Sequence, residues 1–295
     1  MAKNVRIIPR LDIKGPDLVK GVHLEGLRAL GKPEQYARYY YEQGADELIY
    51  MDIVASLYNR NSLHDIITKT AREIFIPLTV GGGLRTIDDI RTVLRAGADK
   101  VALNTAAIRN PDIIREASRM FGSSTIVITI EAIRQDSGNY LAYTDNGREY
   151  TGINAIDWSR RAEELGAGEI LITSVDREGT GKGYDIELIR QVSSAVSIPV
   201  VAHGGGGTLS HIAECLGDGC ADAVAISSML HYGLIKEYSS DYTTGVEGNT
   251  EFLKKGISFS KVQPTNLDTI KSYLAERGVI CRPHKVAKKA VGSES

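Results

Sequence analysis

The chain has 295 residues, of which 42% are hydrophobic and 24% are charged, and its formal net charge is −2. This composition is that of a globular protein with a full core, and the near-neutral charge implies no general affinity for nucleic acid or acidic membranes. The sequence contains no apolar run of the roughly 18 residues that a membrane span needs, and the apolar run near its start is too short for a signal peptide.

Short apolar strands alternate with helix-like runs along the chain. The expected strands are 5–11, 47–51, 77–80, 100–103, 125–130, 169–173, 199–202 and 223–226. The expected helices are 33–43, 63–73, 87–96, 112–121, 153–165, 186–194, 210–216 and 267–277. Continuous apolar strands are typical of a sheet that is covered on both faces. Eight such units predict one (β/α)8 TIM barrel over residues 1–282.

Two segments depart from this regularity. Residues 233–262 lie between the last expected strand and the last helix, and an insertion of that length in the last β/α loop is usually functional or disordered. We expect it to form a lid or rim element. The tail, 283–295, has little to bury and is expected to be disordered.

Three cysteines, Cys215, Cys220 and Cys281, show no metal-ligand spacing. Their odd number favours a reduced cytoplasmic location, and we expect them to be small buried apolar residues. No residue spacing demands a metal, and no cofactor is expected.

One stretch of the chain occurs twice. Val80–Gly83 and the run Gly97–Thr105 match His203–Gly206 and the run Cys220–Ser228 at one constant offset without a gap. The repeat predicts a barrel built from two fused half-barrels. Each copy places a glycine turn before a helix, where backbone N–H groups can approach an anion, so the pair predicts two phosphate sites. The alternative is that these glycines only make tight turns.

Candidate catalytic residues follow from the rule that barrel active sites lie at the C-terminal ends of the strands. Asp12 ends strand one and Glu131 ends strand five, which is opposite, so the two carboxylates are a candidate acid–base pair. Solvated strand-end residues are the alternative. His203 is either a substrate contact or a packed histidine. Further candidate binding residues at these ends are Lys20, Asp52, Gly83, Asn104, Thr105, Ser174, Glu178, Gly179, Gly205, Ser227 and Ser228.

The opposite ends of the strands carry charges of alternating sign, namely Arg6, Glu47, Lys100 and Glu169. These four side chains can close a ring across the barrel bottom. Such a ring is either a salt-bridged plug or a gate for a small polar molecule, and physical reasoning alone favours the plug.

Several segments together resemble the cyclase subunit family of imidazole glycerol phosphate synthase, an enzyme of histidine biosynthesis. They are Arg-Leu-Asp-Ile-Lys at 10–14, Asp-Glu-Leu-Ile-Tyr-Met-Asp-Ile-Val-Ala-Ser at 46–56, Val-Gly-Gly-Gly at 80–83, Gly-Ala-Asp-Lys-Val-Ala-Leu-Asn-Thr-Ala-Ala at 97–107 and Asp-Arg-Glu-Gly-Thr at 176–180. The similarity runs from about Arg6 to Arg282, interrupted by the insertion.

The resemblance implies an activity and a partner. Ammonia from a glutaminase subunit, docked under the barrel in a heterodimer, would travel through the barrel centre. It would react with the bis-phosphate N′-ribulosyl-formimino-aminoimidazole-carboxamide ribotide to give imidazole glycerol phosphate and aminoimidazole carboxamide ribotide. The family's acid–base pair falls on Asp12 and Glu131. Its phosphate-binding positions fall on Gly83, Asn104, Thr105, Gly179, Gly205, Ser227 and Ser228, and its ammonia gate falls on Arg6, Glu47, Lys100 and Glu169.

The sequence departs from the family pattern at four positions. Glu131 and Glu178 stand where the family has aspartate, Arg10 replaces a cysteine, and His203 replaces a serine. One alternative is therefore a cyclase-like paralogue that channels ammonia to a sugar-modifying amidotransferase in surface-polysaccharide synthesis. A sugar-phosphate isomerase on the same half-barrel plan is a third hypothesis, against which the intact gate residues argue.

Overall fold

The computed structural model describes residues 4–23, 25–53, 63–237 and 261–283. Most of the expected insertion, 233–262, and most of the tail that is expected to be disordered, 283–295, lie outside these ranges. Among the described helices, none is long and apolar enough to cross a bilayer.

Eight parallel strands close into a barrel in the described part of the chain. Their order is β10-β11-β12-β1-β4-β5-β6-β7, and pairing of β7 with β10 closes the sheet. The strands are β1 (Asn4–Lys14), β4 (Leu48–Asp52), β5 (Leu78–Gly81), β6 (Lys100–Leu103), β7 (Ile126–Arg134), β10 (Glu169–Ser174), β11 (Val200–His203) and β12 (Ala223–Ile226). The predicted (β/α)8 barrel is confirmed.

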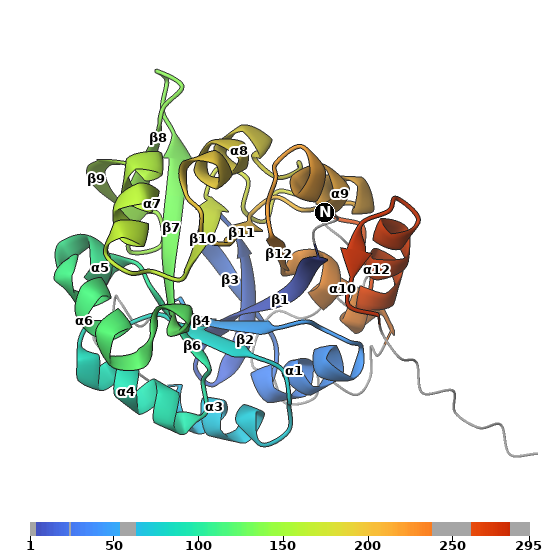
Figure 1. The fold of residues 1–295 in the computed structure, drawn as a ribbon. Helices are drawn as coiled ribbons and strands as arrows, with labels where there is room; N and C mark the ends of the chain where they lie inside the picture. The colour runs from blue at the N-terminus through green and yellow to red at the C-terminus, as the bar shows by residue number, and fades with distance from the viewer. Residues whose placement is uncertain (1–3, 24, 54–62, 238–260, 284–295) are drawn as a thin grey trace, which may run out of the picture.

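Helices surround this barrel on the outside (Figure 1). They are α1 (Pro33–Glu42), α3 (His64–Ala71), α4 (Ile87–Ala96), α5 (Thr105–Arg109), α6 (Asp112–Phe121), α7 (Ala155–Glu164), α8 (Ile186–Ala195), α9 (Leu209–Gly217), α10 (Ser228–Glu237) and α12 (Leu267–Ala275). A 3₁₀ turn, Ser123–Thr125, precedes β7, and the short strand β13 (Ile280–Cys281) pairs with the start of β1.

Strand alternation produces two separate cores. One large cluster, including Ile7, Leu11 and Ile13 of β1, packs between the strands and the helices. A second, smaller cluster, including Ile8, Ala102 and Leu171, fills the inside of the barrel. Successive side chains of a strand point to opposite faces. Arg6, Ile8, Arg10 and Asp12 therefore all face the barrel interior, one above another along β1.

Two antiparallel hairpins extend the barrel and were not among the expected elements. The strands β2 (Asp17–Val22) and β3 (Glu25–Gly31) continue from β1. The strands β8 (Tyr140–Thr144) and β9 (Glu149–Asn154) continue from β7. Since β1 and β7 begin the two halves of the barrel, the hairpins repeat the half-barrel plan that the glycine turns predict.

Two expectations need correction. Residues 233–237 are not loop but the last residues of helix α10, which begins directly after β12 at Ser228. Only one of the three cysteines is buried: Cys215 packs in the core, whereas Cys281 is partly exposed and Cys220 is exposed. Cys220 has a φ of 60° in the turn before β12, and that turn lies at the surface.

Candidate functional site

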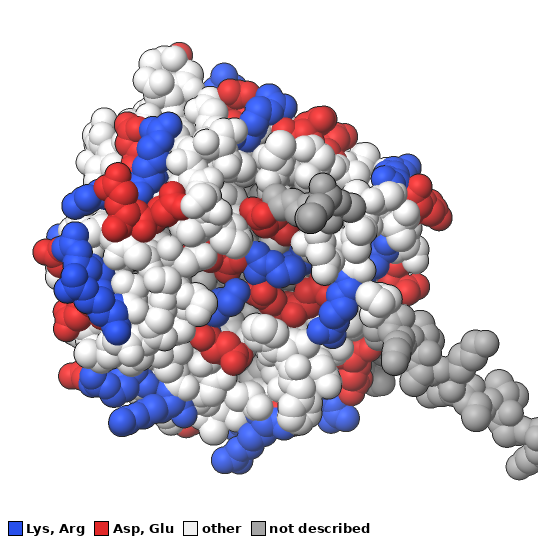
Figure 2. Space-filling model, in the orientation of Figure 1, with Lys and Arg blue, Asp and Glu red and all other residues white. Residues whose placement is uncertain are grey.

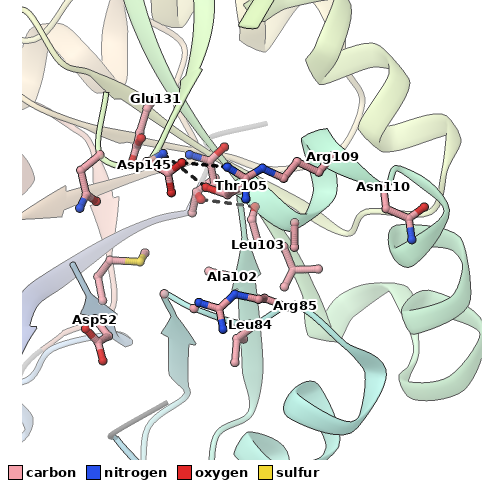
Figure 3. A pocket seen from close by; sticks show the side chains of 17 residues that line it. Asp52, Leu84, Arg85, Ala102, Leu103, Thr105, Arg109, Asn110, Glu131 and Asp145 are labelled. Atoms are coloured by element: carbon pink, nitrogen blue, oxygen red, sulfur yellow. Dashed lines mark hydrogen bonds and ion pairs between the residues drawn. The ribbon is translucent and has the colours of Figure 1, made fainter. Parts of the chain in front are cut away.

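The first pocket lies at the C-terminal ends of β4 to β7 and has a volume of about 220 Å³. Five of the predicted site residues line it: Asp52, Gly83, Asn104, Thr105 and Glu131. Figure 3 shows Asp52, Thr105 and Glu131 around one space, with Glu131 and Asp52 on different sides of it. The first of the two expected anion sites therefore coincides with a pocket, and the carboxylates of Asp52, Glu131 and Asp145 lie on its wall.

The second pocket lies at the C-terminal ends of β10 to β12 and is much smaller, about 20 Å³. Six other predicted residues line it: Lys20, Glu178, Gly179, Gly205, Ser227 and Ser228. Ser228 is the first residue of α10, so the positive end of this helix lies at the pocket wall. Ser227 does not offer its hydroxyl proton there, because Oγ donates to the carbonyl of Arg10 at 2.9 Å.

The glycine turns of the two pockets have similar backbone conformations at one equivalent position, Gly82 and Gly205. Gly82 has a φ of 95° and Gly205 a φ of 103°, both in the region that disfavours side chains. A Cβ on Gly82 would lie 2.1 Å from the Asp52 carbonyl oxygen, and one on Gly205 would lie 2.2 Å from that of Gly183. Glycine is thus required at both positions by conformation and by space.

Glu131 is held by the turn between β8 and β9. Its Oε2 accepts the backbone N–H of Gly147 at 2.9 Å. Burial raises the pKa of Glu131 to about 7, because desolvation outweighs the Gly147 hydrogen bond and the nearby charge of Arg10. A carboxyl group with such a pKa can exist in either protonation state near neutral pH, as a proton-transfer group requires.

Asp12 lies in the opposite electrostatic environment. It is buried, Oδ1 accepts from Arg10 Nε at 2.9 Å, and Oδ2 lies 3.6 Å from Lys20 Nζ. Burial raises its pKa, but Arg10 and Lys20 outweigh burial and hold it below the ordinary value. Lys20 also donates to Glu178, so two cations and two carboxylates form one buried network.

Asp12 lines neither pocket, unlike Glu131. The two carboxylates therefore do not lie on the wall of one cavity in this structure. The physical reason is the strength of the ion pairs, because Arg10 and Lys20 enclose the Asp12 carboxylate. Lys20, which lines the second pocket, connects Asp12 to that pocket.

Ser174 is the one predicted binding residue that lines neither of these two pockets. It is 3% exposed, and its Oγ has no hydrogen-bond partner among the described residues. His203 is packed against Arg10, with Nδ1 at 3.0 Å from Arg10 Nη1, and this contact is compatible with both alternatives, a packed histidine and a substrate contact. It also borders the second pocket.

The charged ring, defined as Arg6, Glu47, Lys100 and Glu169, is closed. Arg6 bonds Glu47 at 2.7 Å and Glu169 at 2.6 Å, and Lys100 lies 3.1 Å from each of the same two carboxylates. Burial lowers the pKa of Arg6, but the two carboxylates raise it above its ordinary value. The ring lies at the strand starts, on the face opposite the pockets. Figure 2 shows acidic and basic side chains gathered at the centre of one barrel face.

Sequence reasoning missed several pocket residues. Asp145 and Asn146 line the first pocket from the β8–β9 turn, and Arg109 of α5 pairs with Asp145 at 3.2 Å (Figure 3). The run Asp-Asn-Gly at 145–147 lies between two strands rich in Tyr and Thr. Asp-Gly and Asn-Gly steps between such runs are strong hairpin signals, so this turn was detectable.

Comparison with known proteins gives consistent matches over most of the chain. A family model described as "Histidine biosynthesis protein" matches residues 6–236. The imidazole glycerol phosphate synthase subunit HisF of Legionella pneumophila is 62% identical over 206 residues, which cover 70% of this chain and 97% of that protein. The subunits of the same name from Alkaliphilus metalliredigens and Streptomyces coelicolor are each 48% identical, over 77% and 79% of this chain and 90% and 92% of their own lengths.

Proposed function

The chain belongs to the histidine biosynthesis protein family, and we propose that Asp12 and Glu131 carry the proton transfers of its cyclase reaction. The protein is an enzyme of the cyclase subunit type of imidazole glycerol phosphate synthase. Its reaction joins ammonia to a bis-phosphate ribulosyl-formimino-aminoimidazole-carboxamide ribotide. The products are imidazole glycerol phosphate and aminoimidazole carboxamide ribotide.

The two phosphates of this substrate are assigned to the two pockets. Gly83, Asn104 and Thr105 hold one phosphate in the first pocket. Gly179, Gly205 and Ser228 hold the other in the second pocket, where Lys20 supplies a positive charge and α10 its N-terminal end. The substrate then spans the barrel mouth with its reacting centre between the pockets, and Asp52, Ser174, Glu178 and Ser227 complete the surrounding polar set.

The electrostatic difference between the two carboxyl groups suggests their roles. When ammonia condenses with a carbonyl, the nitrogen must lose protons and the oxygen must gain them to leave as water. Asp12 has a lowered pKa and acts as the ionised member, whereas Glu131, with a pKa of about 7, is the member that donates. Because Asp12 is enclosed by Arg10 and Lys20, substrate binding must draw Lys20 toward a phosphate before Asp12 can reach the reacting centre.

Ammonia is proposed to come from a glutaminase subunit. The relatives are named as subunits, which implies that this chain also works in a complex. We place the docking surface on the barrel face that carries the charged ring, and we assign the ring, rather than a mere plug, to the control of ammonia entry. The complex is a heterodimer in the cytoplasm, and the cyclase itself uses no metal or cofactor.

The observation that supports this proposal best is that the repeated glycine turns form two pockets on opposite sides of the mouth, one of which contains Glu131. The relatives carry the synthase name and do not favour the paralogue in surface-polysaccharide synthesis. The test is rescue of a histidine auxotroph that lacks the cyclase. The wild-type gene should restore growth without histidine, and an Asp12→Asn gene expressed at the same level should not. Failure of the wild-type gene, with the protein present and folded, would contradict the proposal.

A further inference from the structure

Arg10 crosses the barrel interior between the charged ring and the proposed catalytic pair. It lies on β1, and its side chain reaches Thr173 Oγ1 on β10 at 3.4 Å and His203 Nδ1 on β11 at 3.0 Å. In the order of the sheet, β12 and β11 lie between β1 and β10. A side chain from β1 that touches β10 must therefore pass through the inside of the barrel.

The height of Arg10 along the barrel follows from strand geometry. Arg6, Ile8, Arg10 and Asp12 face inward in turn, and alternate residues of a strand are about 6–7 Å apart along it. Arg6 belongs to the charged ring, and Ile8 belongs to the apolar cluster above it. Arg10 forms the next layer, directly below Asp12. A molecule that rises from the ring along the axis meets the Arg10 guanidinium before it meets Asp12.

The contacts of Arg10 hold it in this position at both ends. Its carbonyl oxygen accepts from Ser227 Oγ at 2.9 Å and from His231 Nε2 at 3.1 Å, and His231 Nδ1 in turn accepts from Tyr40 Oη at 2.6 Å. Its guanidinium donates to Asp12 and to His203. Since arginine only donates, His203 Nδ1 must be the acceptor, and the imidazole is neutral. Arg10 is 4% exposed, so these contacts replace solvent.

We propose that the Arg10 side chain is a gate that closes the barrel axis above the charged ring. Ammonia reaches Asp12 only when the Arg10 guanidinium leaves His203 and Thr173. This inference rests on the proposed function. It gives the ammonia route two successive barriers, the charged ring below and Arg10 above. Because Arg10 and Lys20 are both cationic, they repel ammonium, and neutral ammonia passes once the Arg10 guanidinium has moved.

The same contacts connect this barrier to substrate. Ser227, which fixes the Arg10 backbone, lines the second pocket, and Lys20, which lines that pocket, shares Asp12 with Arg10. A phosphate in the second pocket attracts Lys20 away from Asp12. Asp12 is then held by Arg10 alone, and the two side chains can move together, which opens the axis when substrate is present.

The test compares two ammonia sources in the complex with the co-expressed glutaminase. Ammonia released from glutamine enters from below the charged ring, whereas ammonia from an ammonium salt also enters through the open mouth. The ratio of the glutamine-driven rate to the ammonium-driven rate cancels any loss of acid–base catalysis and reports passage along the axis. Arg10→Met, which removes the charge and keeps the length, should raise this ratio several-fold. Arg95→Met, the same change on the exposed outer face of α4, should leave it unchanged.

His203→Ala is the second variant, because Arg10→Met risks misfolding when Asp12 loses a partner. His203→Ala keeps the Arg10–Asp12 ion pair, frees the tip of the guanidinium and should raise the ratio in the same direction. An unchanged ratio in both variants, with ammonium-driven turnover still measurable, would overturn the role of Arg10 and leave the proposed function standing. Absence of ammonium-driven turnover in the unmodified complex would refute the proposed function and this inference with it.

Discussion

Asp12 and Glu131 differ in what surrounds them more than in their chemistry. Asp12 contacts two cations, whereas Glu131 accepts from a backbone N–H and lies near the charge of Asp145. Two carboxyl groups of one site thereby have pKa values on opposite sides of the ordinary range, which is the condition for an acid and a base at one pH. At the residue scale, the proposed proton transfers therefore depend on these two environments.

Replacement of Glu131 by glutamine tests its raised pKa through stability. The ordinary pKa of 4.5 rises to about 7 on folding, so the folded protein holds this proton more tightly than the unfolded chain does. The contribution of protonated Glu131 to the free energy of unfolding is therefore fully present below pH 4.5 and is lost as the pH rises through 7. Wild type loses this stabilisation as the pH rises, whereas glutamine does not titrate. The free energy of unfolding of Glu131→Gln, measured with urea, should therefore rise by about 1–3 kcal/mol relative to that of wild type as the pH goes from 5 to 8.5. The lower part of this range reflects the side chain's partial exposure to the pocket. Parallel stability curves for the two proteins would contradict a raised pKa.

Replacement of Asp12 by asparagine removes the charge shared by Arg10 and Lys20. Loss of one partner from a buried ion pair costs about 3–5 kcal/mol of unfolding free energy. Because the pKa of Asp12 is lowered, this stabilisation exists above its ordinary pKa and is lost as the pH falls through the folded value, so the variant's deficit should shrink in acid. Turnover should fall about 100- to 10,000-fold, as for loss of a general acid or base. Asp157→Asn, which alters an exposed ion pair with Arg160, is the matched control and should change neither property measurably.

At the scale of elements, the strand–helix units were predictable because each strand is a short apolar run and each helix is amphipathic. The two pockets were predictable because the repeat places glycine turns and small hydroxyl residues at matching strand ends. The hairpins β2–β3 and β8–β9 were not predicted, because they interrupt the alternation of strand and helix and lie where that alternation predicts loops. The Arg10–Asp12–Lys20 network was also not predicted, because which buried charge contacts which depends on side chains that reach across the barrel.

Two glycines with positive φ permit a test that separates the cost of the backbone conformation from the cost of steric overlap. Gly205 and Gly138 both have positive φ, 103° and 87°, but only at Gly205 would a Cβ meet backbone, at 2.2 Å from the Gly183 carbonyl oxygen. Gly138→Ala should therefore cost only the conformational term, about 1–2 kcal/mol. Gly205→Ala should cost about 3 kcal/mol or more because the two turns must also separate. Equal losses in thermal or urea unfolding would show that the close approach at Gly205 carries no energetic weight.

At the scale of the whole molecule, the barrel separates two faces. The pockets and both carboxyl groups lie at the C-terminal ends of the strands, and the charged ring closes the N-terminal ends. Between them lie the apolar layer that contains Ile8 and the layer that contains Arg10. In the proposed function, this order corresponds to a partner at one face, an axial route for ammonia and a substrate at the other face.

The charged ring should contribute to stability as well as to its proposed role. Glu169→Gln leaves Arg6 and Lys100 with one carboxylate, Glu47, instead of two. Because the cations are partly exposed, we expect a loss of about 1–3 kcal/mol in urea unfolding, less than for a fully buried pair. Glu164→Gln breaks an exposed pair with Arg161 and should cost no more than about 0.5 kcal/mol. A loss for Glu169→Gln as small as that of Glu164→Gln would show that the ring's ion pairs are no stronger than surface pairs.

The central claim is that this barrel forms imidazole glycerol phosphate with Asp12 and Glu131 as its proton-transfer groups. Its most direct measurement is steady-state turnover of the purified chain with the bis-phosphate substrate and ammonium salt, followed by product formation. Wild type should form product, whereas Asp12→Asn and Glu131→Gln, each shown to be folded, should fall by at least about 100-fold. Wild-type inactivity, or unchanged turnover in both folded variants, would contradict the claim.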